Sequence, residues 1–164
     1  MIWVIRAGRH SAYYEKYIQN SKVYIPWEGY HIDLSTFDTR QEFKEVVKKE
    51  KGVDNRTSIA NWYGQLYMFV KEMREGDLVL IPSRATKSYC LAEIVGAYKY
   101  SKNEKDKLYH SRDIRIIDQS IPKSVFAQEI NYSLGAFRTI FRARYEEEIL
   151  QSVNNWRAVN ENSI

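Results

Sequence analysis

The sequence contains little cysteine, proline or glycine: one, three and seven residues among 164. The single cysteine, Cys90, excludes an internal disulfide and any cysteine-rich zinc site, and its strand-like surroundings predict a buried, inert thiol. No apolar run approaches the roughly 20 residues that a membrane-spanning helix needs. The start of the chain is typical of a strand and not of a charged leader. These absences predict a cytoplasmic protein with no membrane partner.

Aromatic residues are the unusual class among those present, with 13 Tyr, 4 Trp and 6 Phe. Small barrels bury aromatic side chains, and nucleic-acid-binding proteins stack bases on them, so their number alone does not separate the two uses. The formal net charge of +4 and a pI near 9.0 favour a polyanionic partner. Composition therefore points towards nucleic acid without establishing it.

Hydrophobic periodicity predicts strands and helices along most of the chain. Strands are expected at residues 2–6, 22–27, 77–82, 88–100 and 112–118, with a short last strand before residue 141. Helices are expected at 10–20, 39–49, 58–74 and 144–153, with Thr39 or Asp38 as the N-cap of the second and Gly76 as the C-cap of the third. Residues 52–57 are expected to form a polar connection.

The order of these segments predicts an α+β fold around one small β-barrel. Helices are inserted after the first two strands, and a further helix closes the domain at its C-terminal end. The predicted domain spans residues 1–153. Residues 154–164 are polar and are expected to form a tail or the start of a linker.

Several segments, in conserved order, resemble the EVE/PUA-like domains, relatives of YTH domains, at the N-termini of Mrr-type restriction proteins and modification-dependent restriction GTPases. The matching segments are residues 3–9, 23–27, 33–35, 64–73, 76–79, 94–100, 110–112, 121–122 and 135–137. The resemblance implies a PUA/EVE-like barrel that binds nucleic acid and accepts a flipped, often modified base. It also implies a targeting role in a restriction or antiphage defence system, with a nuclease or motor domain in a longer chain or a partner subunit.

A flipped base requires an aromatic platform, hydrogen bonds to its edge and cations for the flanking phosphates. We expect Trp27 to stack the base, the segment 6–9 and Ser83 to line the pocket, and Arg84, Lys87, His110 and Arg112 to contact phosphates. The full set of candidate nucleic-acid-binding residues is Arg6, Ala7, Gly8, Arg9, Trp27, Asn61, Trp62, Ser83, Arg84, Lys87, Tyr98, His110 and Arg112.

Each candidate also has a purely structural interpretation that the sequence leaves open. Trp27 can fill the barrel mouth as core, and Ala7-Gly8 can form an ordinary turn. Trp62 and its neighbour Tyr63 point about 100° apart on a helix, so only one of them is expected to be core. Tyr98 can pack across strands instead of stacking a base.

No arrangement of residues predicts an enzyme, a metal site or a cofactor. Asp33, Glu42 and Lys44 have the spacing of a metal-dependent nuclease, but Glu42 and Lys44 fall in a helix where that motif normally lies on a strand. The histidines His10 and His31 lack the spacing of metal ligands. We therefore expect a reader of modified DNA without catalytic residues.

Two alternative functions, with partners other than DNA, are also compatible with the sequence. The same fold is compatible with an RNA-binding domain, and the closing helix at residues 144–153 is compatible with a protein-interaction module. A steep loss of affinity with salt would favour nucleic acid, DNA or RNA, over a protein partner.

Overall fold

One curled sheet forms the centre of the protein, and its computed structural model describes residues 1–52, 56–102, 105 and 107–161. Seven strands form the sheet in the order β2-β6-β4-β3-β1-β7, with β5 paired to β6. The pair β1 and β3 is parallel, and the other pairs are antiparallel. The strands are β1 (Ile2–Ile5), β2 (Lys22–Tyr24), β3 (Leu78–Ser83), β4 (Ser88–Ile94), β5 (Lys99–Tyr100), β6 (His110–Pro122) and β7 (Ile140–Arg142).

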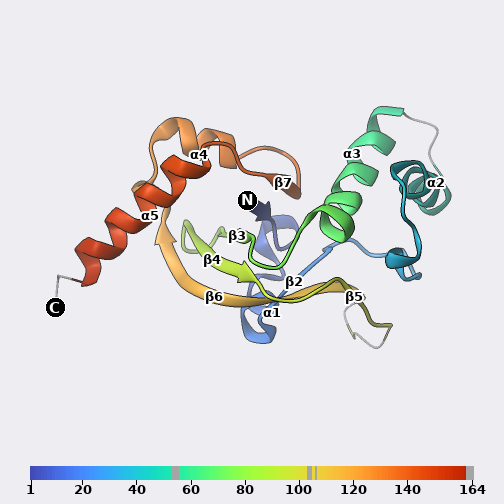
Figure 1. The fold of residues 1–164 in the computed structure, drawn as a ribbon, viewed down its shortest axis with the longest axis horizontal. Helices are drawn as coiled ribbons and strands as arrows, with labels where there is room; N and C mark the ends of the chain where they lie inside the picture. The colour runs from blue at the N-terminus through green and yellow to red at the C-terminus, as the bar shows by residue number, and fades with distance from the viewer. Residues whose placement is uncertain (53–55, 103–104, 106, 162–164) are drawn as a thin grey trace.

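The long strand β6 gives the sheet its curvature. Its beginning pairs with β2 and β5, and the rest pairs with β4. The β4–β6 register shifts twice, between Tyr89 and Leu91 and between Leu91 and Ala92, and such irregularities bend a strand and increase its twist. The sheet therefore curls into a half-barrel (Figure 1). The predicted α+β class with a small barrel-like sheet is confirmed at this level.

Helices cover both ends of the sheet, with α2 and α3 beside one end and α4 and α5 beside the other (Figure 1). The α-helices are α1 (Tyr14–Asn20), α2 (Arg40–Lys51), α3 (Arg56–Tyr67), α4 (Gln128–Leu134) and α5 (Glu146–Glu161). Short 3-10 turns lie at Arg9–Ser11, Leu34–Thr36 and Lys123–Val125, and a π-helix at Met68–Glu72 continues α3. Of the two predicted N-caps, Thr39 is the one that caps α2, because its hydroxyl accepts a hydrogen bond from the Glu42 amide at 3.2 Å.

Strand β1 contributes to two hydrophobic clusters, one on each face of the sheet. Trp3 and Ile5 lie in the larger cluster, which includes residues of α1, α2 and α3. Ile2 and Val4 lie in the second, which includes residues of α4 and α5. Side chains alternate between the faces of a strand, so a strand buried on both faces has a continuous apolar sequence. This explains why residues 2–5 give a clear strand signal.

Several element boundaries differ from the sequence prediction. The expected strand at 88–100 is two strands, and Gly96 lies in the break, where an added Cβ would be 3.0 Å from the Asp113 Cβ. The helix expected to reach residue 74 ends with the π-helix, and its C-cap is Met73 instead of Gly76. Helix α4 was not expected at all. Of the predicted polar connection 52–57, residues 53–55 lie outside the described residues, Gly52 caps α2, and residues 56–57 belong to α3.

The C-terminal helix extends well beyond its predicted end. Helix α5 runs over Glu146–Glu161, so the predicted helix end near residue 153 is wrong. Trp156 packs against the second hydrophobic cluster together with Val153, three residues earlier on the same helix face. Arg157 also forms an ion pair with Asp118 of β6 at 3.0 Å. Trp156 and Arg157 therefore tie this part of α5 to the rest of the domain, whereas residues 158–161 are exposed.

None of the helices in the described ranges has the length and apolar character needed to cross a bilayer.

Candidate functional site

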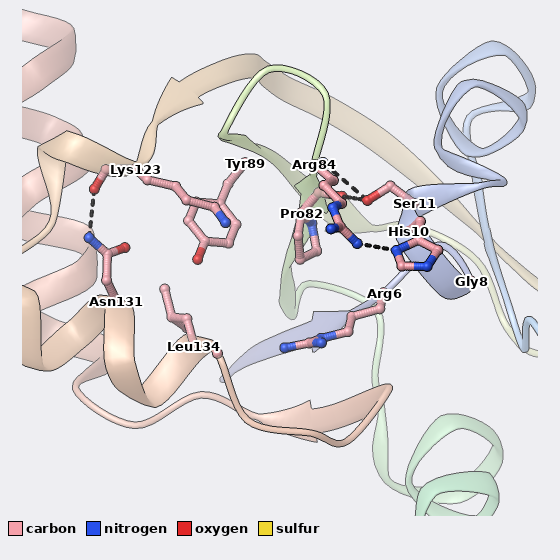
Figure 2. A pocket seen from close by; sticks show the side chains of 11 residues that line it. Arg6, Gly8, His10, Ser11, Pro82, Arg84, Tyr89, Lys123, Asn131 and Leu134 are labelled. Atoms are coloured by element: carbon pink, nitrogen blue, oxygen red, sulfur yellow. Dashed lines mark hydrogen bonds between the residues drawn. The ribbon is translucent and has the colours of Figure 1, made fainter.

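A pocket of about 380 Å³ opens beside the C-terminal ends of β1 and β3. The segment after β1, the β3–β4 hairpin and the segment from the end of β6 to α4 line it, and Figure 2 shows their side chains facing one another across the space. The lining residues are Arg6, Gly8, His10, Ser11, Pro82, Arg84, Tyr89, Lys123, Asn131, Leu134 and Gly135. Its size is in the range of pockets that hold a small ligand.

A tight turn after β1 forms one wall of the pocket. Gly8 has φ +79°, and a Cβ at this position would lie 2.6 Å from the Tyr13 ring. His10 and Ser11 also have left-handed backbone angles, so the helix predicted from residue 10 begins only at Tyr14. The prediction that Gly8 allows a close approach fits its place in the pocket wall. Ala7 is buried and does not line the pocket.

Arg6 points into the pocket from the end of β1 (Figure 2). Its guanidinium Nε is buried and has no hydrogen-bond partner among the described residues. Buried N–H groups are almost always paired in folded proteins, because an unpaired donor loses its bonds to water without replacement. Arg6 is therefore a strong candidate to donate a hydrogen bond to a ligand.

The turn after β1 also holds Arg84 in place at the pocket. Its backbone amide donates to the Ser11 hydroxyl at 3.1 Å, and that hydroxyl donates to the Pro82 carbonyl at 3.3 Å. The Arg84 guanidinium contacts the His10 Nδ1, which accepts the bond. These contacts hold a second guanidinium at the pocket rim, as Figure 2 shows.

The far wall presents an aromatic ring and an unpaired acceptor. Tyr89 packs edge-to-face on Phe126 at 5.7 Å, and the Lys123 ammonium lies 5.7 Å from the Tyr89 ring centroid. The Asn131 Nδ2 donates to the carbonyls of Lys123 at 2.8 Å and Phe126 at 3.2 Å. These bonds assign its amide orientation and leave the buried Oδ1 without a partner in the described part of the chain.

The electrostatic character of the pocket is positive. Arg6, Arg84 and Lys123 line it, and no aspartate or glutamate is among its lining residues. Burial raises the pKa of the Tyr89 hydroxyl, and the neighbouring Arg6 charge partly opposes this. The pocket thus combines three cations with an aromatic ring and an acceptor, which suits an anionic ligand with a planar polar part.

Three of the predicted binding residues meet in this pocket: Arg6, Gly8 and Arg84. Ser83 lies next to it but is buried, and its hydroxyl accepts a hydrogen bond from Thr86 at 2.9 Å. Arg9 and Lys87 are exposed nearby without lining the pocket.

Trp27 does not line the pocket, contrary to the expectation that it would stack a base beside Arg6. Strand β2 ends at Tyr24, and the following loop brings Trp27 edge-to-face against Trp62 of α3 at 4.5 Å. Both rings pack against the larger hydrophobic cluster, and the Lys51 ammonium lies 4.4 Å from the Trp62 ring. Asn61 accepts hydrogen bonds from Gln65 of the same helix. These residues form a separate aromatic group.

His110, Arg112 and Tyr98 form internal hydrogen bonds instead of a phosphate-binding surface. His110 and Arg112 are buried, which corrects the expectation that they contact phosphates. Arg112 donates to three backbone carbonyls, and the Tyr98 hydroxyl bonds to the His110 ring and accepts from the Leu34 amide. The sequence could not show this burial, because it depends on how β6 packs against the end of the π-helix.

The far wall of the pocket was missed by sequence reasoning. Tyr89 looks like an ordinary strand residue, Lys123 follows the Ile121-Pro122 pair, and Asn131 lies in the unexpected helix α4. The pairing of β4 with β6 brings Tyr89 opposite Ile121, two residues before Lys123. The sequence would have predicted this wall only if it had shown that β4 pairs with β6.

Helix α3 holds the segment beside the pocket through Gln65. This side chain is buried, and its Oε1 accepts hydrogen bonds from the amides of Thr139 and Ile140, each at 2.9 Å. Gln65→Leu should lower the free energy of unfolding by about 2 kcal/mol, because two buried amides lose their acceptor. Urea unfolding would measure this, with Gln41→Leu on the exposed face of α2 as the control. Equal stabilities of the two variants would contradict it.

Groups of three or more His, Cys, Asp or Glu side chains that could hold a metal ion do not occur within the described ranges. Cys90 is fully buried, as predicted, and burial raises its pKa to about 12. The thiol is therefore protonated at neutral pH.

Comparisons with known proteins identify a family and distant structural similarities. The sequence model of the family described as "Domain of unknown function (DUF8426)" matches residues 3–143. The NMR structure of Rpa0253 from Rhodopseudomonas palustris is similar at 13% identity and a TM-score of 0.43, covering 93% of this chain and 90% of that one. The crystal structure of Atu2648 from Agrobacterium tumefaciens is similar at 14% identity and a TM-score of 0.42, covering 94% and 91%. Among curated proteins, none matches this chain.

Proposed function

The chain belongs to the family described as a domain of unknown function, DUF8426, and we propose that it is a nucleic-acid-binding domain that holds one nucleotide in the Arg6 pocket. We define the Arg6 pocket as the cavity lined by Arg6, Arg84, Tyr89, Lys123 and Asn131 with their neighbours. Its proposed ligand is a base flipped out of DNA, often a modified one. The domain acts as a reader and has no catalytic role of its own.

The observation that carries this proposal is a buried donor and a buried acceptor in one pocket, both unpaired in the described chain. Arg6 Nε supplies the donor and Asn131 Oδ1 the acceptor. The edge of a nucleobase presents complementary groups, such as ring nitrogens and carbonyl oxygens that accept and exocyclic amines that donate. A simple anion would satisfy Arg6 but not the Asn131 oxygen.

The remaining groups suit the other parts of a nucleotide. Arg84 and Lys123 lie at the pocket and can neutralise phosphates, and Tyr89, only 3% exposed, closes the far wall. A pocket of about 380 Å³ accommodates a nucleotide but not a base pair within a helix. A duplex must therefore extrude the base that is read.

The biological setting that fits this reading is the targeting of modified DNA. The sequence resemblance to PUA/EVE-like domains supports it, as do the barrel-like sheet and the basic net charge. We therefore propose a PUA/EVE-like module that directs a nuclease or motor domain, in the same chain or in a partner, to modified DNA during restriction or antiphage defence. RNA is the alternative ligand, and the binding experiment therefore includes it.

Binding of short nucleic acids tests the proposal, with Arg6→Met as the variant. The duplexes are unmodified, methylated at adenine or modified at cytosine, and a single-stranded RNA is added. We expect one modified duplex to bind most tightly, with affinity falling steeply as salt rises, and Arg6→Met to weaken it at least tenfold. Lost hydrogen bonds to a base edge contribute about 1–3 kcal/mol, which is the physical reason for that factor.

Lys49→Met is the matched control, because it removes one positive charge from the exposed surface of α2. It should leave binding within about twofold. The absence of binding to every nucleic acid at low salt would overturn the proposal, and so would equal binding by Arg6→Met and the unchanged protein. If the RNA binds most tightly, the Arg6 pocket remains the proposed nucleotide site, but its ligand is RNA instead of DNA.

A further inference from the structure

An exposed aromatic and basic surface lies next to the Arg6 pocket. It forms a wide hollow between α4, the loop after it and the start of α5. Asn131 and Gly135 line both the hollow and the Arg6 pocket, so the two adjoin. The hollow has no part in the function proposed above.

Three aromatic side chains at this hollow are exposed to solvent. Phe137 is 104% exposed and Tyr132 88% exposed, whereas Tyr145 is partly exposed at 43%. A phenyl ring held entirely in water loses the burial that normally stabilises it, and clustered exposed aromatics mark binding surfaces. Phe137 stands in the loop between α4 and β7, which runs over residues 135–139.

The loop that carries Phe137 is anchored at its end. The amides of Thr139 and Ile140 donate to the buried Gln65, and the Thr139 carbonyl accepts from the Arg6 amide at 2.9 Å. Thr139, at the end of the loop, is thus hydrogen-bonded to the backbone of Arg6, whose side chain points into the pocket. The end of this loop, two residues after Phe137, is consequently held beside the Arg6 pocket.

The charge around the hollow suits a polyanion. Arg138, Arg142 and Arg144 line it, opposed by Glu129. Arg142 is paired with Glu146 at 3.3 Å, whereas Arg138 and Arg144 form no ion pair within the described ranges. Arginines beside exposed aromatic rings form the combination that binds nucleic-acid strands, with phosphates on the cations and bases on the rings.

We propose that Phe137 is a wedge that inserts into the DNA stack beside the nucleotide held in the Arg6 pocket, while Arg138 and Arg144 bind the phosphates of the flanking strand. This inference rests on the function proposed above. Proteins that distort duplexes insert apolar side chains, phenylalanine among them, between base steps. Extrusion of a base costs unstacking energy, and a ring that fills the space stabilises the open duplex.

A comparison of duplex and single-stranded ligands tests the wedge. Phe137→Ala should weaken binding of the preferred duplex at least tenfold and leave binding of the same strand without its complement within about twofold, because a single strand needs no wedge to open it. Arg6→Met should weaken both ligands. Replacement of the base opposite the flipped one by 2-aminopurine should give a fluorescence increase with the unchanged protein and a smaller one with Phe137→Ala.

Two control variants separate the wedge from general effects. Ile32→Ala removes another exposed apolar side chain, in the loop after β2, and should bind both ligands normally. Phe137→Trp retains a flat ring and should keep most of the duplex affinity. Because Phe137 is fully exposed, its variants should unfold at the same temperature as the unchanged protein.

The possible outcomes distinguish this inference from the function on which it rests. If Arg6→Met weakens the duplex but Phe137→Ala does not, the nucleotide pocket stands and the wedge is overturned. If no nucleic acid binds, both are overturned. If sedimentation shows a dimer that Phe137→Ala converts to a monomer, with duplex binding unchanged, the surface is an interface between copies of the chain and the wedge is likewise overturned.

Discussion

Arg112→Met is expected to lower the free energy of unfolding by about 3 kcal/mol, because it leaves buried carbonyls without hydrogen-bond donors. The Arg112 guanidinium donates to the carbonyls of Phe69 at 2.7 Å, Val70 at 3.1 Å and Gly96 at 3.1 Å. Only 5% of Arg112 is exposed, so water cannot take over these bonds.

The position of two of these carbonyls explains the size of the effect. Phe69 and Val70 belong to the π-helix that ends at Glu72, and the last carbonyls of a helix have no partner within it. The guanidinium therefore supplies missing donors and places a positive charge at the negative end of the helix. Burial lowers the pKa of Arg112, which Asp77 and Glu75 partly oppose, so methionine recovers some desolvation energy.

Arg115→Met provides the comparison for this measurement. Arg115 is on the same strand, but its side chain is 62% exposed and its ion pair with Glu93 faces solvent, so the expected loss is below about 1 kcal/mol. Urea unfolding followed by circular dichroism measures both variants. A loss below about 1 kcal/mol for Arg112→Met would show that the helix end does not depend on this guanidinium.

Stability should also fall as the pH is lowered from about 6.5 to about 4, because His110 is held in its neutral form. Burial lowers the pKa of His110 to about 4, more than the hydrogen bond to Tyr30 and the charge of Asp33 raise it, and His31 lowers it slightly further. Its Nε2 donates to the Tyr30 carbonyl at 2.9 Å, and its Nδ1 accepts from the Tyr98 hydroxyl at 2.5 Å. A proton on Nδ1 would replace that acceptor by a second donor.

The direction of the pH effect follows from the two states. The folded pKa lies below the unfolded value of about 6.5, so between these two pH values the unfolded chain binds more protons. Stability is therefore fully present above the unfolded pKa and is lost progressively as the pH falls towards about 4. The total loss from this residue is about 3 kcal/mol, at up to about 1.4 kcal/mol for each pH unit.

Denaturant unfolding at several pH values between 7 and 4 measures this contribution. His110→Gln should have a shallower dependence, because glutamine keeps one donor and one acceptor but does not titrate. His31→Gln is the matched control: His31 is exposed and packs beside Tyr109, and it should change the slope far less than His110→Gln, because its charge lowers the pKa of His110 only slightly. Parallel curves for His110→Gln and the unchanged protein would contradict the assignment.

Part of the pocket was accessible from sequence. Arg6 and Gly8 stand at the end of the strongest N-terminal strand, and Arg84 follows a strand with an equally clear apolar run. Residues at the ends of well-predicted strands can be placed without knowing what packs on them. The expected place of Trp27 beside Arg6 was wrong, because nothing local determines where the loop after a three-residue strand turns.

The sequence by itself determined the elements whose patterns are local: the α+β class, the strands β1 and β3, the beginning of β4, a cap at residue 38 or 39 and the burial of Cys90. Only the tertiary structure decided the burial of Arg112 and His110 and the convergence of Tyr89, Lys123 and Asn131 on Arg6. The physical reason is that strand propensity and capping depend on neighbours in the chain. Desolvation and hydrogen-bond pairing depend instead on contacts between distant segments, and the register of β4 against β6 sets those contacts.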